Sequence, residues 1–98
     1  LPEEHRPNGY YGRLHRESQK QEHPAWYSSL ILTGKLWTYL ADLNEQAEER
    51  LDLIIEQMKA TEGVTEELKA RNQLEWVGRM NNIRNRAEEI IKSELIYI

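Results

Sequence analysis

The sequence predicts an all-α fold: a long antiparallel helical hairpin, preceded by a shorter N-terminal helical segment and an extended N-terminal arm. Residues 35–61 and 66–97 repeat apolar side chains every three or four positions, which is the spacing of one helix face. The three prolines all lie within the first 24 residues, so only glycines interrupt helix beyond that point. No stretch alternates polar and apolar residues over a useful strand length, so strands are not expected.

The N-terminal part is expected to contain an arm and two short helices. Residues 1–12, LPEEHRPNGYYG, should form the arm, because two prolines, an Asn-Gly pair and a further glycine favour turns. Residues 13–22 are polar helix formers, and this helix should end before Pro24, since the residue preceding a proline is displaced from the helical region. Pro24 suits the first turn of the next helix, over 24–33. Residues 13–98 are expected to form a single helical domain.

The hairpin is predicted from two amphipathic helices, 35–61 and 66–97, joined by a short turn. Gly63 can end the first helix as a left-handed C-terminal cap, and Thr65 can cap the start of the second. The first apolar stripe comprises Leu36, Leu40, Leu43, Ala47, Leu51, Ile54, Ile55 and Met58. The second comprises Trp76, Val77, Met80, Ile83, Ala87, Ile90, Ile91 and Leu95. We expect these two stripes to pack against each other.

Composition excludes several classes of protein. A membrane span needs about 20 consecutive apolar residues, and no strictly apolar run here exceeds three residues, as at 30–32. The absence of cysteine excludes disulfides and thiolate chemistry. We therefore expect a cytoplasmic protein without membrane contact. Because the chain opens with Leu1 rather than Met, we expect the natural N-terminus to lie upstream.

Three polar residues fall within the apolar sectors of the two long helices. These residues are Asn44 on the first helix and Arg84 and Glu94 on the last. We interpret them as internal polar contacts that fix the register of the hairpin, with a polar site in a groove as the alternative. In a hairpin that turns near Gly63, Glu94 would come level with Lys35.

Few residues offer catalytic or metal-binding chemistry. The histidines, His5, His15 and His23, lack the spacing of a helical metal site and are expected to be exposed. No serine has the context of a nucleophile elbow, and the acidic residues lie mostly on solvated faces. The sequence therefore predicts a protein that is not an enzyme and holds no metal, cofactor or small-molecule substrate.

Two rows of side chains are candidates for nucleic-acid contact. The N-terminal basic row is Arg13, Arg16 and Lys20, which share one side of the helix 13–22 and can lie along phosphates. The C-terminal basic row shares one flank of the last helix and carries residue types that read base edges; its members are Arg79, Asn82 and Arg86. Against both stands the formal net charge of −4. Arginines paired with neighbouring glutamates are the alternative for either row.

The hairpin is expected to be incomplete by itself. Two long helices with one apolar stripe each leave much of their surface in water, and small helical chains often complete a core by association. We therefore expect a homodimer formed through the hairpin and the segment 26–31. A monomeric three-helix bundle is the alternative.

Three segments of the chain carry a family resemblance: YGRLHRE, LTGKLWTYLADLNEQAEERLDLIIEQM and EGVTEELKARNQLEWVGRMNNIRNRAEEIIKSELIYI. They resemble the TnpV family, small proteins encoded on mobile elements of Firmicutes. The resemblance covers nearly the whole chain, although relatives carry more arginine and lysine over 13–25. It implies an accessory role in the movement of the element or its control, and it brings no catalytic residues.

Two functions follow as hypotheses. In the first, the chain is a non-enzymatic accessory protein that associates with DNA in transposition or its control. In the second, it is a helical interaction module that binds another element-encoded protein without touching DNA. The salt dependence of binding separates the two, because phosphate contacts release counterions and apolar contacts do not.

Overall fold

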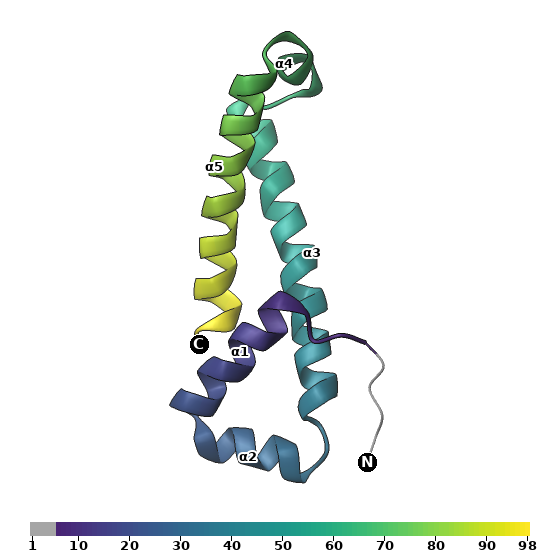
Figure 1. Cartoon of the computed structure of the whole chain (residues 1–98), viewed down its shortest axis with the longest axis vertical. Coiled ribbons are helices and arrows are strands. Elements are labelled where there is room, and N and C mark those ends of the chain that lie inside the picture. The colour runs from purple at the N-terminus through teal and green to yellow at the C-terminus, as the bar shows by residue number, and fades with distance from the viewer. Residues whose placement is uncertain (1–5) are drawn as a thin grey trace.

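The computed structural model describes residues 6–98, and every regular element in that range is a helix (Figure 1). The elements are α1 (Gly9–Glu22), α2 (Pro24–Leu32), α3 (Leu36–Glu62), α4 (Glu66–Arg71), α5 (Gln73–Ile91) and the π-helical turn η1 (Lys92–Ile96). Helices α3 and α5 run antiparallel along a body of 55 × 26 × 18 Å. Figure 1 shows α1 crossing the open end of this hairpin, α2 below it and α4 at the turn. The predicted all-α hairpin is confirmed.

Local cap chemistry places the end of α3 where the sequence indicates. Gly63 has φ of 68°, and its backbone N–H donates to the carbonyl of Lys59. This left-handed conformation suits glycine because it carries no Cβ. Thr65 Oγ1 accepts a hydrogen bond from the backbone N–H of Leu68 at 3.2 Å, which caps α4. Helix α3 therefore ends within one residue of its predicted position.

The predicted continuous helix over 66–97 is wrong, because it breaks at Asn72. The Asn72 Oδ1 atom accepts from the backbone N–H of Glu75 at 3.1 Å, and its backbone φ of −148° is not helical. Asn72 thus starts a new helix, α5, and leaves α4 as a separate helix of six residues. At the other end, α5 passes into η1 at Lys92. The signal for the break, Asn-x-x-Glu, was present in the sequence.

Helix α1 begins at Gly9, four residues earlier than predicted, so residues 9–12 belong to a helix rather than to an extended arm. Its first turn is held from outside, since Asn44 Oδ1 on α3 accepts from the backbone N–H of Tyr11 at 3.2 Å. A Cβ at Gly9 would collide with the Asn44 side chain, and one at Gly12 would lie 3.1 Å from the Leu40 carbonyl oxygen. The glycines allow α1 to approach α3 closely. Residues 6–8 precede the helix, and the arm residues 1–5 lie outside the described part of the chain.

The core lies between the two long helices. Ile83, Ala87 and Ile91 of α5 are fully buried, and the cluster extends to α3 and to α4 through Leu68. A second, smaller cluster joins α2 to the start of α3 and contains Tyr27, Leu36 and Leu40. The two clusters hold α1, α2 and α4 against the hairpin.

Candidate functional site

The C-terminal basic row is neutralised by carboxylates of the chain itself. Arg86 binds both carboxylate oxygens of Glu62 on α3, at 2.8 and 2.6 Å. Arg79 pairs with Glu75 one turn earlier on α5, at 2.8 Å. Asn82 is exposed between them. Both arginines therefore lie in ion pairs with glutamates, which was the alternative interpretation of this row. To contact DNA, each would have to leave its glutamate and bind the edge of a base.

The N-terminal basic row is divided in the same way. Arg16 Nε donates to the Tyr27 hydroxyl at 3.2 Å, and its guanidinium lies 5.2 Å from the centre of the Trp37 ring. Arg16 therefore ties α1 to α2 and α3. Arg13 and Lys20 are exposed, and neither forms an ion pair with a side chain in the described range. Two of the three cations of this row are thus available to a ligand.

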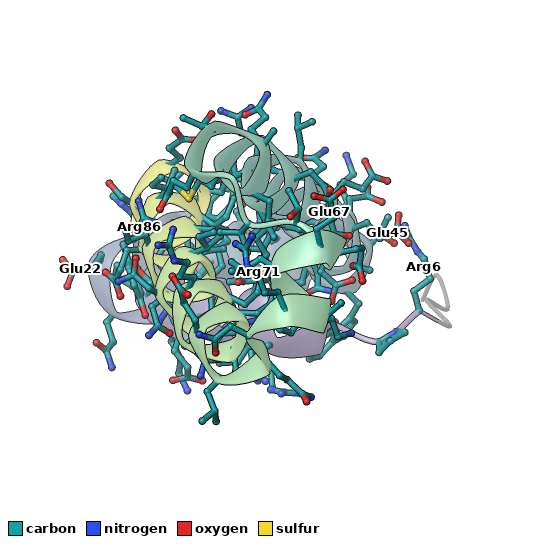
Figure 2. The ribbon with its side chains drawn as sticks, turned by 90° about the horizontal axis from the view of Figure 1, so that it is seen from above. Arg6, Glu22, Glu45, Glu67, Arg71 and Arg86 are labelled. Atoms are coloured by element: carbon teal, nitrogen blue, oxygen red, sulfur yellow. The ribbon has the colours of Figure 1, made fainter. Side chains whose placement is uncertain are left out.

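Charges of both signs surround the long axis of the molecule (Figure 2). At one edge of that view, Arg6 lies against acidic α3 and pairs with Asp42 at 2.8 Å and with Glu45 at 3.0 Å. Arg86 lies on another side. A broad basic face, which is typical of DNA-binding domains, is not present over residues 6–98.

The three polar residues predicted within apolar faces have different positions. Asn44 is buried, accepts from Tyr11 as described above, and donates through Nδ2 to Glu48 at 3.3 Å. Arg84 and Glu94 are exposed, contrary to the prediction. The long arginine side chain keeps its charged group in water even where its helix position borders apolar residues.

Glu94 pairs with Arg50 at 3.5 Å and not with the Lys35 region. The partner is displaced by fifteen positions along α3. The cause is α4: because residues 64–72 turn aside at the tip instead of extending the last helix, α5 is shifted along α3. The break at Asn72 therefore decides the register of the hairpin.

His15 is buried rather than exposed, which the sequence reasoning missed. Its Nδ1 atom lies 2.7 Å from the Ile96 carbonyl oxygen, and its Nε2 atom lies 2.8 Å from the Tyr39 hydroxyl. A carbonyl oxygen only accepts, so Nδ1 carries the proton and Nε2 accepts from Tyr39. Burial lowers the pKa of His15 below its usual value, despite the bond to Ile96, and burial also raises the pKa of Tyr39.

A neighbouring contact completes this arrangement. Gln19 Nε2 donates to the Ile98 carbonyl oxygen at 3.0 Å. His15, Gln19 and Tyr39 thus join α1 and α3 to the C-terminal segment, and we call them the polar clamp. Tyr11, His15 and Gln19 lie four positions apart and form the buried face of α1. A hollow of about 420 Å³ adjoins the clamp, but the bonded atoms of His15 and Gln19 are already satisfied.

A groove runs between α3 and α5. Two adjoining hollows, of about 450 and 410 Å³, share Met58, Ile90 and Arg86. Ile54, Met58 and Ile90 supply its apolar surface. The ion pairs Arg86–Glu62 and Arg50–Glu94 lie at its two ends. We call this feature the α3–α5 groove.

Helix α2 presents an apolar surface at the opposite end from the turn. Its nine residues include no charged side chain, and only Tyr27 is buried. Trp26 packs edge-on against Tyr39, with 5.1 Å between the ring centres, and remains partly exposed. Ile31 is half-exposed and Leu32 is 85% exposed. We call Trp26, Ile31 and Leu32 the α2 platform.

Two further features concern membranes and metals. From residue 6 onward, no helix combines the length and apolar character needed to cross a bilayer. In the same range, no three side chains of His, Cys, Asp or Glu converge in an arrangement that could hold a metal ion.

These features define a class: small all-α proteins built on an antiparallel helical hairpin, with an exposed apolar helix at the open end and an apolar groove along one side. No curated protein and no solved structure gives a significant match to the chain. The family model described as "Transposon-encoded protein TnpV" matches residues 1–96. The chain therefore belongs to the TnpV family of transposon-encoded proteins.

Proposed function

We propose that this chain is a non-enzymatic, cytoplasmic accessory protein of a transposon that acts by binding another protein of the same element. The observation that carries this proposal is the α2 platform, a helix without charged residues whose side chains are mostly left in water. Membership of the TnpV family supports the transposon context. The partner surface is an amphipathic helix whose apolar side covers α2.

The energetics favour such a contact at Leu32 and Ile31. Complete burial of a leucine or isoleucine side chain contributes about 1.5–3 kcal/mol. Leu32 is almost fully exposed, so nearly all of that gain remains for a partner. The Trp26–Tyr39 ring pair gives the platform a rigid aromatic wall, and aromatic side chains are common at the centres of interfaces.

DNA association is the second candidate, and it rests on Arg13 and Lys20. These two cations are exposed on α1 and unpaired among the described side chains. Two phosphate contacts give only a small salt dependence, and the net charge of −4 opposes long-range attraction to DNA. The protein contact therefore ranks first.

The test is a binding titration with each protein encoded by the same transposon, purified singly. Leu32→Glu should weaken binding to the partner by about tenfold or more, since it places a charge in an apolar contact. Leu74→Glu is the matched control, because Leu74 is equally exposed at the far end of the molecule. Binding that is equal in the parent and Leu32→Glu would refute the platform.

Salt separates the DNA alternative in the same format. Affinity for element-end DNA should fall between low and moderate salt, and the double variant Arg13→Ala/Lys20→Ala should reduce the salt slope by about two. Affinity for the protein partner should change little with salt. Tight DNA binding by the parent, lost in the double variant, would place DNA association first.

A further inference from the structure

We infer that a second copy of the chain occupies the α3–α5 groove, so that two hairpins pair face to face as a four-helix bundle. The two copies are related by a two-fold axis that lies in the interface, at right angles to the length of the groove. The turn of each hairpin then lies beside the open end of the other. This inference does not depend on the proposed partner at α2, which lies outside the groove.

The chain leaves more surface exposed than a compact monomer of its size. A compact monomer of 11.7 kDa exposes about 5,900 Å², whereas this chain exposes 6700 Å². The excess reflects an elongated hairpin whose long faces are left in water, and association of small helical chains covers surface of this kind. The radius of gyration agrees, being 17.2 Å against about 12.6 Å for a compact domain of this length.

The groove lies on one face of the hairpin, and the other helices of the chain do not line it. None of the residues lining the groove belongs to α1, α2 or α4. Helix α1 packs on α3 and η1 instead, and there burial, with a smaller effect of Glu88 on α5, raises the pKa of Tyr11 to about 12. Glu88 and Arg86 are two positions apart, which is about 200° around a helix. The groove is therefore the side of the hairpin that the rest of the chain leaves uncovered.

An exposed apolar side chain, Leu53, lies beside the groove. Leu53 on α3 is 50% exposed. It lies three and four positions from Arg50 and Gln57, which both line the groove, so it shares their flank of α3. Leu53 adds an exposed apolar side chain at the edge of the groove that Ile54 and Met58 line. A second copy would cover it, and helix pairs packed in this way form four-helix bundles.

The charged groups at one end of the groove are complementary to those at the other end of a second copy. Twelve residues of α3, about 18 Å, separate the Arg86–Glu62 end from the Arg50–Glu94 end. The two-fold axis brings one end of each copy opposite the other end of its partner. Arg86 then faces the second copy's Glu94, and Arg50 faces the second copy's Glu62. Each arginine thus has one carboxylate within its own chain and one across the interface.

The experiment uses two double charge swaps that keep the pairs within each chain. The first variant is Arg86→Glu/Glu62→Arg, and the second is Arg50→Glu/Glu94→Arg. In either homodimer, like charges would oppose each other across the interface at both ends. Sedimentation equilibrium at micromolar concentration should give twice 11.7 kDa for the parent. Each swap should raise its dimer dissociation constant by about tenfold or more.

Mixing the two variants supplies the decisive measurement. In a heterodimer of the two swaps, opposite charges meet again at both ends, so the mixture should recover the parent's dissociation constant. The swap Glu56→Lys/Lys59→Glu is the matched control, because this exposed α3 pair lies away from the groove and should leave dimerisation unchanged. Circular dichroism of each variant monitors helix content.

Two further variants separate the groove from other surfaces. Leu53→Glu should weaken dimerisation by about tenfold or more, whereas Leu32→Glu should leave the dimer intact while it disrupts the proposed partner contact. A parent that sediments at 11.7 kDa would overturn the inference. So would swaps that dimerise as tightly as the parent, a mixture that fails to recover, or an unchanged Leu53→Glu.

Discussion

Replacing His15 with leucine tests the polar clamp. The side chain is 1% exposed and bridges the Ile96 carbonyl oxygen on one side and the Tyr39 hydroxyl on the other, 81 and 24 positions away in the chain. Leucine fills much of the same volume but offers neither bond. The change therefore isolates the hydrogen bonds from the packing, and it acts on the junction of α1, α3 and the C-terminal segment.

The expected loss can be worked from these two contacts. Each hydrogen bond contributes about 0.5–1.5 kcal/mol, and a buried carbonyl left without a donor costs about 1–3 kcal/mol. Tyr39 is only partly buried, so its hydroxyl can turn to water. The apolar leucine recovers part of the loss through burial. We expect His15→Leu to lower the free energy of unfolding by about 2–4 kcal/mol.

Urea unfolding followed by circular dichroism at pH 7.5 gives this quantity, with the slope checked for constancy. His23→Leu is the control, because His23 is exposed and should change stability by less than about 0.5 kcal/mol. His15→Asn should lie between the parent and His15→Leu, since the shorter amide can still donate to Ile96. A loss below about 1 kcal/mol for His15→Leu would refute the clamp as a source of stability.

Three other predictions follow from the same structure. Burial lowers the pKa of folded His15 below the unfolded value of about 6.5, so the unfolded chain binds the proton more tightly, and stability should fall as pH drops below that value. This decline, measured by urea unfolding at several pH values, should be smaller in His15→Leu; an identical pH profile would contradict the assignment. Asn72→Ala removes the cap of α5 and should lower the free energy of unfolding by about 1 kcal/mol in a thermal melt. Asn81→Ala, at an exposed position of α5, should be nearly neutral. Trp76→Ala should cost about 2–3 kcal/mol, less than for a fully buried tryptophan. Trp76→Phe should cost under about 1 kcal/mol, because it removes a buried indole N–H that has no bonding partner in the described structure; a larger loss for phenylalanine than for alanine would contradict this.

The sequence alone determined the all-helical character of the chain and the ends of its longest helix. Apolar spacing and the Gly63 and Thr65 caps act within a few residues, so α3 could be placed to within one position at each end. Membership of the TnpV family was equally visible in the sequence. These features need no knowledge of where the rest of the chain lies.

Only the tertiary structure decided which residues meet. The helix break at Asn72 shifts α5 along α3 relative to the predicted hairpin. Glu94 therefore pairs with Arg50, and Arg86 pairs with Glu62. A helical wheel gives the direction of a side chain but not the neighbour that covers it. It therefore could not predict that Arg84 is exposed and that His15 is buried. The carbonyl groups that His15 and Gln19 bond, those of Ile96 and Ile98, lie about 80 positions away. Local periodicity carries no information over that distance, because such contacts depend on how distant helices pack.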